Sequence, residues 1–204
     1  MKLRRHARFL YQPPLPLGKN GHFVTNSKAH WLLAEKAATE GTVLLKNDGT
    51  LPLKQGASVC LFGLGAGDFQ FGGGGSGKVF TQNLISLADG LEEAAKEGKL
   101  RFFSELVDFY TDSVNAIIRK AKAEHPDPMD FLVWRRSYQM PMPVLPEELY
   151  QRAVSFGDTA IFCLCRYTSE GDTNGDRKGG KGDFELWDEE RCCSSVCAVT
   201  LKTS

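Results

Sequence analysis

The chain has 204 residues, and its 25 lysines and arginines are balanced by 25 aspartates and glutamates. This balance argues against nucleic acid and against an anionic membrane surface as partners, because both attract basic proteins. No apolar run reaches about 18 residues, so no membrane-spanning helix is expected. The basic N-terminus lacks the apolar stretch of a signal peptide, and we therefore expect a cytoplasmic protein.

Six cysteines are present. Cys60, Cys163 and Cys165 lie in predicted buried strands, where a free thiol behaves as a small apolar group. The other three cluster at positions 192, 193 and 197, but no histidine follows His125 to complete a zinc site. We therefore expect no metal site and no cofactor.

The first half of the chain alternates helices with short apolar runs. Residues 1–27 are expected to form an extended lead-in, and a helix follows over about 27–40 with Asn26 or Ser27 as its N-cap. Residues 43–45 predict a short strand before a tight turn at Asn47-Asp48-Gly49. The run SVCLFG at 58–63 predicts a buried strand, because it is short and continuously apolar.

The stretch from Gly63 to Val79 is the most glycine-dense part of the chain, and it fails two phosphate-binding patterns. A P-loop needs serine or threonine where Val79 stands, and a dinucleotide fingerprint needs glycine where Asp68 stands. We expect this loop to shape a pocket, with Ser76 as its short polar side chain. A nucleotide-binding α/β domain and a plain surface loop stay open as alternatives.

The second half predicts helices over about 86–97, 101–123 and 147–156. Residues 129–146 read as an irregular connector, in which Trp134 and Tyr138 either cover a sugar-sized pocket or simply pack. Thr159–Arg166 is a short apolar run typical of a strand covered on both faces. A polar, glycine-punctuated loop that contains Glu170 follows it.

Alternating strands and helices predict an α/β fold with a mostly parallel sheet flanked by helices. The strands at 58–63 and 159–166 would then point the same way. In open α/β sheets, ligands bind outside the carboxyl ends of the strands. We therefore expect Ser76 and Glu170 to lie near one another at that edge.

Three motifs, in this order, resemble those of glycoside hydrolase family 3 β-glucosidases. Residues 33–53, LAEKAATEGTVLLKNDGTLPL, are similar to the opening of the family's α/β-sandwich domain. GGGGSG at 72–77 resembles its glycine-serine loop, and RYTSEGDTNGDRKGGKGDFELWDEE at 166–190 resembles its acid/base loop. The resemblance implies a sandwich domain over 28–190, with three layers and incomplete at its C-terminal end.

The resemblance also implies roles for individual residues. Glu170 matches the acid/base and Ser76 matches a loop serine near the sugar, although Ser169 abuts Glu170 where the family has an intervening glycine. Asp176, Arg177 and Asp183 would hold the loop in shape. The implied reaction is retaining hydrolysis of β-glucosides or oligosaccharides, in which one carboxyl group attacks and the other moves the proton.

The nucleophile of this family belongs to a TIM-type barrel, and no such segment is found in the chain. The resemblance therefore implies a barrel domain as partner, in cis or in trans. A non-catalytic carbohydrate-binding or interaction fragment of the same fold is the alternative from another functional class.

The charges around Glu170 oppose one another. A proton donor must be protonated near neutral pH, so its pKa must be raised by burial or by like charges. The neighbouring acids at 172, 176 and 183 would raise the pKa of Glu170, whereas Arg166 and Arg177 would lower it. The sequence leaves the balance between them open.

The last segment, 191–204, departs from the family. The family continues with an amphipathic helix and further strands, whereas RCCSSVCAVTLKTS shows no helical periodicity. We interpret this atypical tail as a truncation or a shifted reading frame after about Glu190. Translation of the downstream DNA in the other two frames tests this interpretation.

Overall fold

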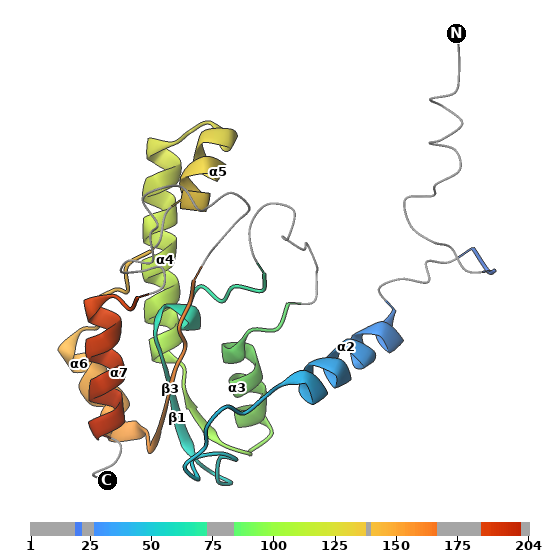
Figure 1. Cartoon of the computed structure of the whole chain (residues 1–204). Helices are drawn as coiled ribbons and strands as arrows, with labels where there is room; N and C mark the ends of the chain where they lie inside the picture. The colour runs from blue at the N-terminus through green and yellow to red at the C-terminus, as the bar shows by residue number, and fades with distance from the viewer. Residues whose placement is uncertain (1–18, 22–26, 73–83, 138–139, 167–184, 201–204) are drawn as a thin grey trace. The chain divides into compact units, whose positions relative to one another are not determined.

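The structure is a computed structural model that describes residues 19–21, 27–72, 84–137, 140–166 and 185–200 (Figure 1). Contacts divide the chain into two compact units, Met1–Pro52 and Leu53–Ser204. None of the described helices is both long enough and apolar enough to cross a membrane.

The first unit contains one described helix, α2, over Lys28–Gly41. Its predicted N-cap is confirmed, because the Ser27 hydroxyl accepts a hydrogen bond from the His30 N–H at 3.4 Å. The tight turn is confirmed as well, since the Gly49 N–H donates to the Asn47 side chain at 3.1 Å. The strand predicted at 43–45 is wrong. No described strand pairs with it, and Leu45 is 94% exposed.

The second unit is built on three parallel strands. They are β1 (Ser58–Phe62), β2 (Arg101–Phe103) and β3 (Thr159–Phe162), in the order β2-β1-β3. The predicted parallel arrangement of the first and last strands is confirmed. All five residues of β1 are buried because that strand lies in the middle. β3 ends at Phe162 and is only half-buried, so the expectation of a longer strand covered on both faces is wrong.

Five helices and a short 3-10 turn complete the described part of this unit. They are η1 (Leu64–Ala66), α3 (Leu87–Lys96), α4 (Glu105–Glu124), α5 (Pro128–Ser137), α6 (Glu147–Phe156) and α7 (Asp188–Thr200). Helix α3 packs against β2, α4 and α6 against β1, and α7 against β3. Figure 1 shows α6 and α7 on one side of the strands and α3 on the other. The predicted fold class, α/β with a parallel sheet flanked by helices, is confirmed.

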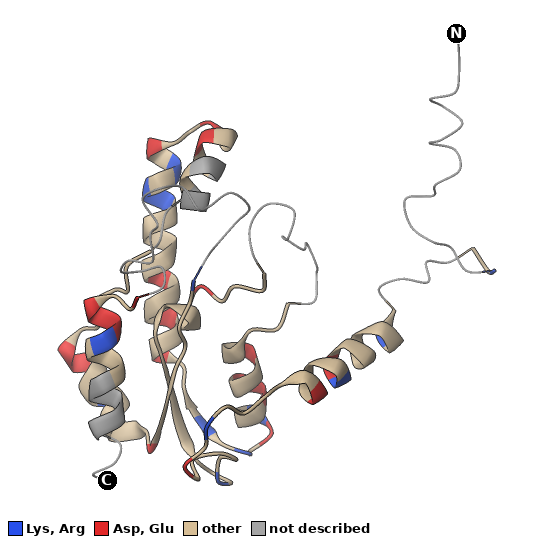
Figure 2. Cartoon of the chain, viewed as in Figure 1, with Lys and Arg blue, Asp and Glu red and all other residues tan. Residues whose placement is uncertain are grey.

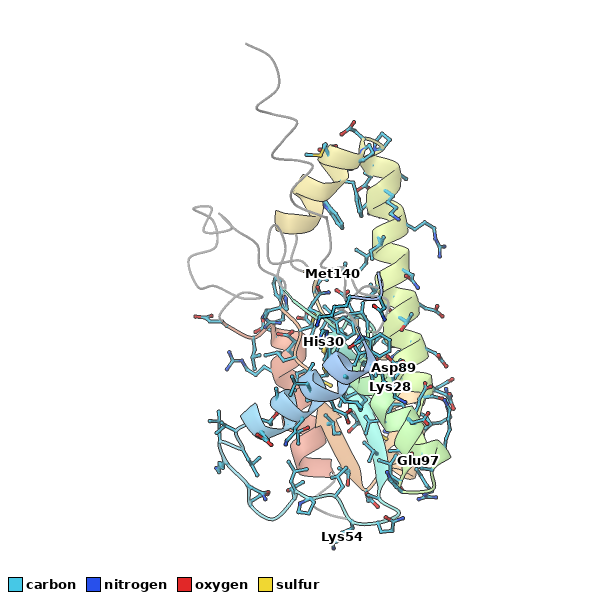
Figure 3. The ribbon with its side chains drawn as sticks, turned by 90° about the vertical axis from the view of Figure 1, so that its right-hand side faces the viewer. Lys28, His30, Lys54, Asp89, Glu97 and Met140 are labelled. Atoms are coloured by element: carbon cyan, nitrogen blue, oxygen red, sulfur yellow. The ribbon has the colours of Figure 1, made fainter. Side chains whose placement is uncertain are left out.

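The start of α3 shows why its prediction from local sequence succeeded. The Ser86 hydroxyl accepts from the Asp89 N–H at 3.1 Å, and the Asp89 carboxylate accepts from the Ser86 N–H at 2.7 Å. This reciprocal capping box satisfies two backbone donors that a helix start leaves free. Figure 3 labels Asp89 in this turn.

Strand β2 corrects the expectation of a helix from residue 101. The Arg101 N–H donates to the Ala57 carbonyl at 2.8 Å, and the Arg101 guanidinium binds the Ser58 hydroxyl. Pairing with β1 therefore decides the conformation of these three residues, and α4 begins only at Glu105. An apolar pattern that continues smoothly from 102 into the helix hides this boundary.

Helix α5 replaces the first part of the irregular connector expected over 129–146, whereas residues 140–146 are irregular as predicted. The Asp127 carboxylate accepts from the N–H groups of Met129 and Asp130, at 2.8 and 3.0 Å. Pro128 stands at the first helical position, where its missing N–H costs nothing. Local capping by Asp127 therefore starts a helix at Pro128.

The core gathers on β1. Val59 and Leu61 are fully buried there, together with Leu106 and Tyr110 of α4. Deleting a buried leucine side chain in such a core typically costs about 2–5 kcal/mol. The contact between β1 and α4 therefore contains the most deeply buried apolar side chains of the described core.

Candidate functional site

The chain leaves β1 and β3 at the same edge of the sheet, because these strands are parallel neighbours. All five predicted site residues lie in the segments that follow, and all lie outside the described residues: Ser76, Glu170, Asp176, Arg177 and Asp183. What the structure describes is the base of those segments. We call residues 63–72, 163–166 and 185–190 the strand-end frame.

The two strand exits contact each other directly within this frame. The Gly65 N–H donates to the Cys163 carbonyl at 3.1 Å. The Cys165 thiol donates to the Asp68 carbonyl at 2.9 Å. The prediction that both exits share one edge is therefore confirmed, whereas the proximity of Ser76 and Glu170 stays a prediction.

Two glycines allow the close approach of backbones in the frame. Gly63 has a φ of +95°, and a Cβ placed on it would lie 2.6 Å from the Cys163 carbonyl oxygen. A Cβ on Gly67 would lie 2.4 Å from the Thr111 backbone nitrogen in α4. The lack of a side chain at these two positions admits neighbouring protein backbone at close range.

A small apolar cluster supports the frame from α4 and from the connector before α6. It consists of Leu64, Val114, Met140 and Cys165, with Ile117 and Ile118 packed against it. Figure 3 labels Met140, which is 5% exposed. The cluster packs both strand exits against α4, the longest of the described helices.

The most strongly bonded part of the frame is an ion pair between Arg166 and Glu190. The guanidinium donates to both carboxylate oxygens, with nitrogen-to-oxygen distances of 2.7 and 2.6 Å. The Glu190 side chain is 2% exposed and the Arg166 side chain 20%. Such a bidentate pair fixes the direction of both side chains as well as their separation.

Further hydrogen bonds fix both partners of this pair. The Glu190 carboxylate also accepts from the Trp187 N–H at 2.9 Å, which caps the start of α7. The Arg166 guanidinium also donates to the Cys165 carbonyl at 2.9 Å. The first turn of α7 is acidic, as Figure 2 shows, and negative charge there is favoured by the helix dipole. These contacts explain how 188–200 forms a helix without apolar periodicity.

The ion pair changes one electrostatic expectation. The sequence counts Arg166 among the cations that would lower the pKa of Glu170. In the structure a carboxylate lies 2.6 Å from that guanidinium and offsets its charge. Sequence reasoning missed this pair. Its signals were Arg166 at the end of a predicted strand and Glu190 in the acidic run at 188–190.

Burial favours the protonated thiol form of two cysteines near the frame. Burial, with the Asp158 carboxylate as a second cause, raises the pKa of Cys60 to about 12. Burial also raises the pKa of Cys163. A thiol must ionise to act as nucleophile or metal ligand, so neither cysteine is suited to that chemistry at neutral pH. Within the described ranges, no group of three His, Cys, Asp or Glu side chains is placed to hold a metal.

Trp134, considered above as a cover for a sugar pocket, stacks on aromatic rings where α4 meets α5. Its ring lies 5.9 Å from His125 and 5.7 Å from Phe131, centroid to centroid. This is the packing role that the sequence left open as the second option. Tyr138 lies outside the described residues.

Comparison with known proteins places this geometry in a family. The sequence model of the "Glycosyl hydrolase family 3 C-terminal domain" matches residues 42–199. The chain is 36% identical over 185 residues to Beta-glucosidase A of Butyrivibrio fibrisolvens, covering 90% of this chain and 20% of that protein. It is 35% identical over 150 residues to a Beta-glucosidase of Ruminococcus albus, covering 71% of this chain and 14% of that protein.

A solved structure agrees with these sequence matches. The structure of beta-glucosidase 3B from Thermotoga neapolitana in complex with glucose superposes with a TM-score of 0.68 at 29% identity. The match covers 91% of this chain and 24% of that one. The chain thus spans one fifth or less of the length of these two curated relatives. Since the family model covers most of its residues, this chain belongs to glycoside hydrolase family 3, of which it carries the C-terminal α/β domain.

Proposed function

We propose that this chain supplies the acid/base carboxyl group, Glu170, of a β-glucosidase-like glycosidase. The observation that carries the proposal is the family match, which runs through both site segments, 73–83 and 167–184. The described strand exits from which those segments leave are bonded to each other at one sheet edge. A barrel domain, in cis or in trans, would supply the nucleophile.

The proposed reaction is a retaining double displacement. In the first step the protonated Glu170 carboxyl group gives its proton to the glycosidic oxygen while the barrel carboxylate attacks the sugar. In the second step the Glu170 carboxylate takes a proton from water, which then releases the sugar. Ser76 would contact the sugar, and Asp176, Arg177 and Asp183 would hold the loop.

The proposed substrates are β-glucosides or related oligosaccharides. Two relatives are named beta-glucosidases, and the Thermotoga neapolitana enzyme was solved with glucose. The chain spans only a fraction of those proteins, so their substrates are a starting point for its own. An aryl β-glucoside is therefore tested first, and other β-linked sugars follow. A role in carbohydrate metabolism and a cytoplasmic location stay predictions, which metabolite profiling and cell fractionation would test.

The test is hydrolysis of a chromogenic aryl β-glucoside. The chain is assayed alone, and also in a chimera in which it replaces the matching fifth of Butyrivibrio fibrisolvens Beta-glucosidase A. Each form is compared with its Glu170→Gln variant and with Glu189→Gln, which removes an exposed carboxylate from the same region of sequence. Loss of a general acid/base typically costs about 10²–10⁴-fold in rate.

Three outcomes are informative. A large loss in the Glu170 variant alone would support the proposal. Equal turnover in all three proteins would show that Glu170 is not the acid/base. Turnover in the chimera but not in the isolated chain would show that the chain needs a barrel.

A non-catalytic carbohydrate-binding fragment is the second candidate, since the Thermotoga neapolitana relative was solved in complex with glucose. Calorimetric titration with glucose separates it from the first. Binding by the isolated chain, together with an inactive chimera, would favour the binding module.

A further inference from the structure

A buried ion pair joins the two ends of the segment that carries Glu170. Arg166 is the last described residue before that segment, and Glu190 lies five residues beyond the first described residue after it. The two side chains make two charge-assisted hydrogen bonds, at 2.7 and 2.6 Å. The pair therefore joins the chain just beyond β3 to the first turn of α7.

Each partner of the pair is also fixed to a different structural element. Arg166 follows β3, and its guanidinium donates to the Cys165 carbonyl. Glu190 lies in the first turn of α7 and accepts from the Trp187 N–H. The guanidinium reaches the Glu185 carbonyl too, at 3.4 Å. The pair thus links the strand exit, the returning chain and the helix start in one bonded unit.

Stability alone is a poor reason for such a pair. Taking two charges out of water costs several kcal/mol per ion, and well-packed apolar residues often replace a buried pair without loss. What apolar residues cannot reproduce is the fixed direction of two parallel N–H···O bonds. A catalytic carboxyl group needs this kind of constraint, because a displacement of about 1 Å can cost about 100-fold in rate.

We propose that Arg166 and Glu190 are positioning residues, which hold the ends of the 167–184 segment in the register that aligns its acid/base carboxyl group. The inference rests on the proposed function for the role of Glu170. It assigns to Arg166 and Glu190 no contact with the substrate. Their effect is transmitted through the two ends of the segment.

The first test compares Glu190→Gln with Glu189→Gln. Glu189 is the exposed neighbour in the same helical turn, so the control removes the same charge without touching the pair. Exchange of the Trp187 amide hydrogen is measured in the full chain, because its N–H is bonded to Glu190. We expect exchange to accelerate about tenfold or more in the Glu190 variant and to change little in the control.

The second test separates positioning from stability. In the double variant Arg166→Met/Glu190→Leu, apolar side chains replace both charges, and the unfolding midpoint is expected to stay near that of the unsubstituted protein. In the chimera we expect kcat for the aryl β-glucoside to fall about 10- to 100-fold while KM changes little. A double variant with wild-type stability and wild-type kcat would overturn the proposal.

The two proposals can fail separately. If Glu170→Gln leaves turnover unchanged, the assignment of the acid/base fails, and the exchange measurement still decides whether the pair fixes the segment ends. The positioning role fails if Glu170→Gln abolishes turnover while the two variants at Glu190, the single and the double, behave like Glu189→Gln. The compared quantities are exchange of the Trp187 amide hydrogen and kcat. Should the double variant not fold, Glu190→Gln supplies the kcat comparison.

Discussion

The two strand exits of the sheet are stabilised in opposite ways. After β1 the chain is held by backbone contact, because Gly63 and Gly67 have no side chain to keep Cys163 and α4 away. After β3 it is held by side chains, through the Arg166–Glu190 ion pair. The β1 exit depends on glycines that have no side chain. The β3 exit depends on two charged side chains that lie 24 residues apart in the sequence. Single substitutions should therefore affect the two exits differently.

The largest expected effect is at the β3 exit. Glu190→Leu alone leaves the Arg166 guanidinium without its carboxylate in a site that is four-fifths buried. Breaking a buried pair by removing one partner costs about 3–5 kcal/mol, and we expect the lower end because Arg166 keeps some solvent contact. Urea unfolding measures the change. A loss below about 1 kcal/mol would show that the pair is solvated in solution.

At the β1 exit, adding a single methyl group should already destabilise the fold. Gly63→Ala puts a methyl group 2.6 Å from the Cys163 carbonyl oxygen and strains a φ of +95°. Overpacking and backbone strain each cost about 1–3 kcal/mol, so we expect a loss of about 2–3 kcal/mol in urea unfolding.

Gly90→Ala is the matched control for that substitution. Gly90 lies inside α3, and a Cβ there meets nothing within 4 Å. We expect a gain of up to about 1 kcal/mol from the better helix former. Equal losses at both glycines would refute the account of close backbone approach.

A smaller effect is expected away from both exits, at the capping box of α3. Ser86→Ala removes a side-chain cap and should cost about 1 kcal/mol. Hydrogen bonds from Ser86 lower the pKa of Asp89. A carboxylate whose folded pKa is lowered stabilises the fold above its unfolded pKa, and that contribution is lost as the pH falls through the folded value. The stability difference between the two proteins should therefore shrink below about pH 4, where Asp becomes protonated.

The smallest expected effect is a difference in thiol labelling rates between exposed and buried cysteines. Cys192 is exposed, whereas Cys60 is buried with a pKa raised to about 12. A maleimide reagent at pH 7 should therefore modify Cys192 well before Cys60, as read by mass spectrometry of peptides. In Gly63→Ala we expect faster labelling of Cys163, because the methyl group pushes against its backbone. Unchanged Cys163 labelling would show that the strain is absorbed elsewhere.

Local sequence determined much of the fold. The helices α2, α3 and α6 were predicted because caps and apolar spacing act within a few residues. The buried run at 58–63 predicted β1, and alternation of elements predicted the parallel sheet. Helix α5 belongs to this class too, since Asp127 and Pro128 form a local start signal that was overlooked.

Tertiary structure alone decided β2 and the strand-end frame. Arg101–Phe103 is a strand because β1 offers it backbone partners 43 residues away in sequence. The contacts of Cys165 with Asp68 and of Arg166 with Glu190 span 97 and 24 residues. No periodicity or capping rule acts over such separations, because these partners meet only after the sheet has brought its strand ends together.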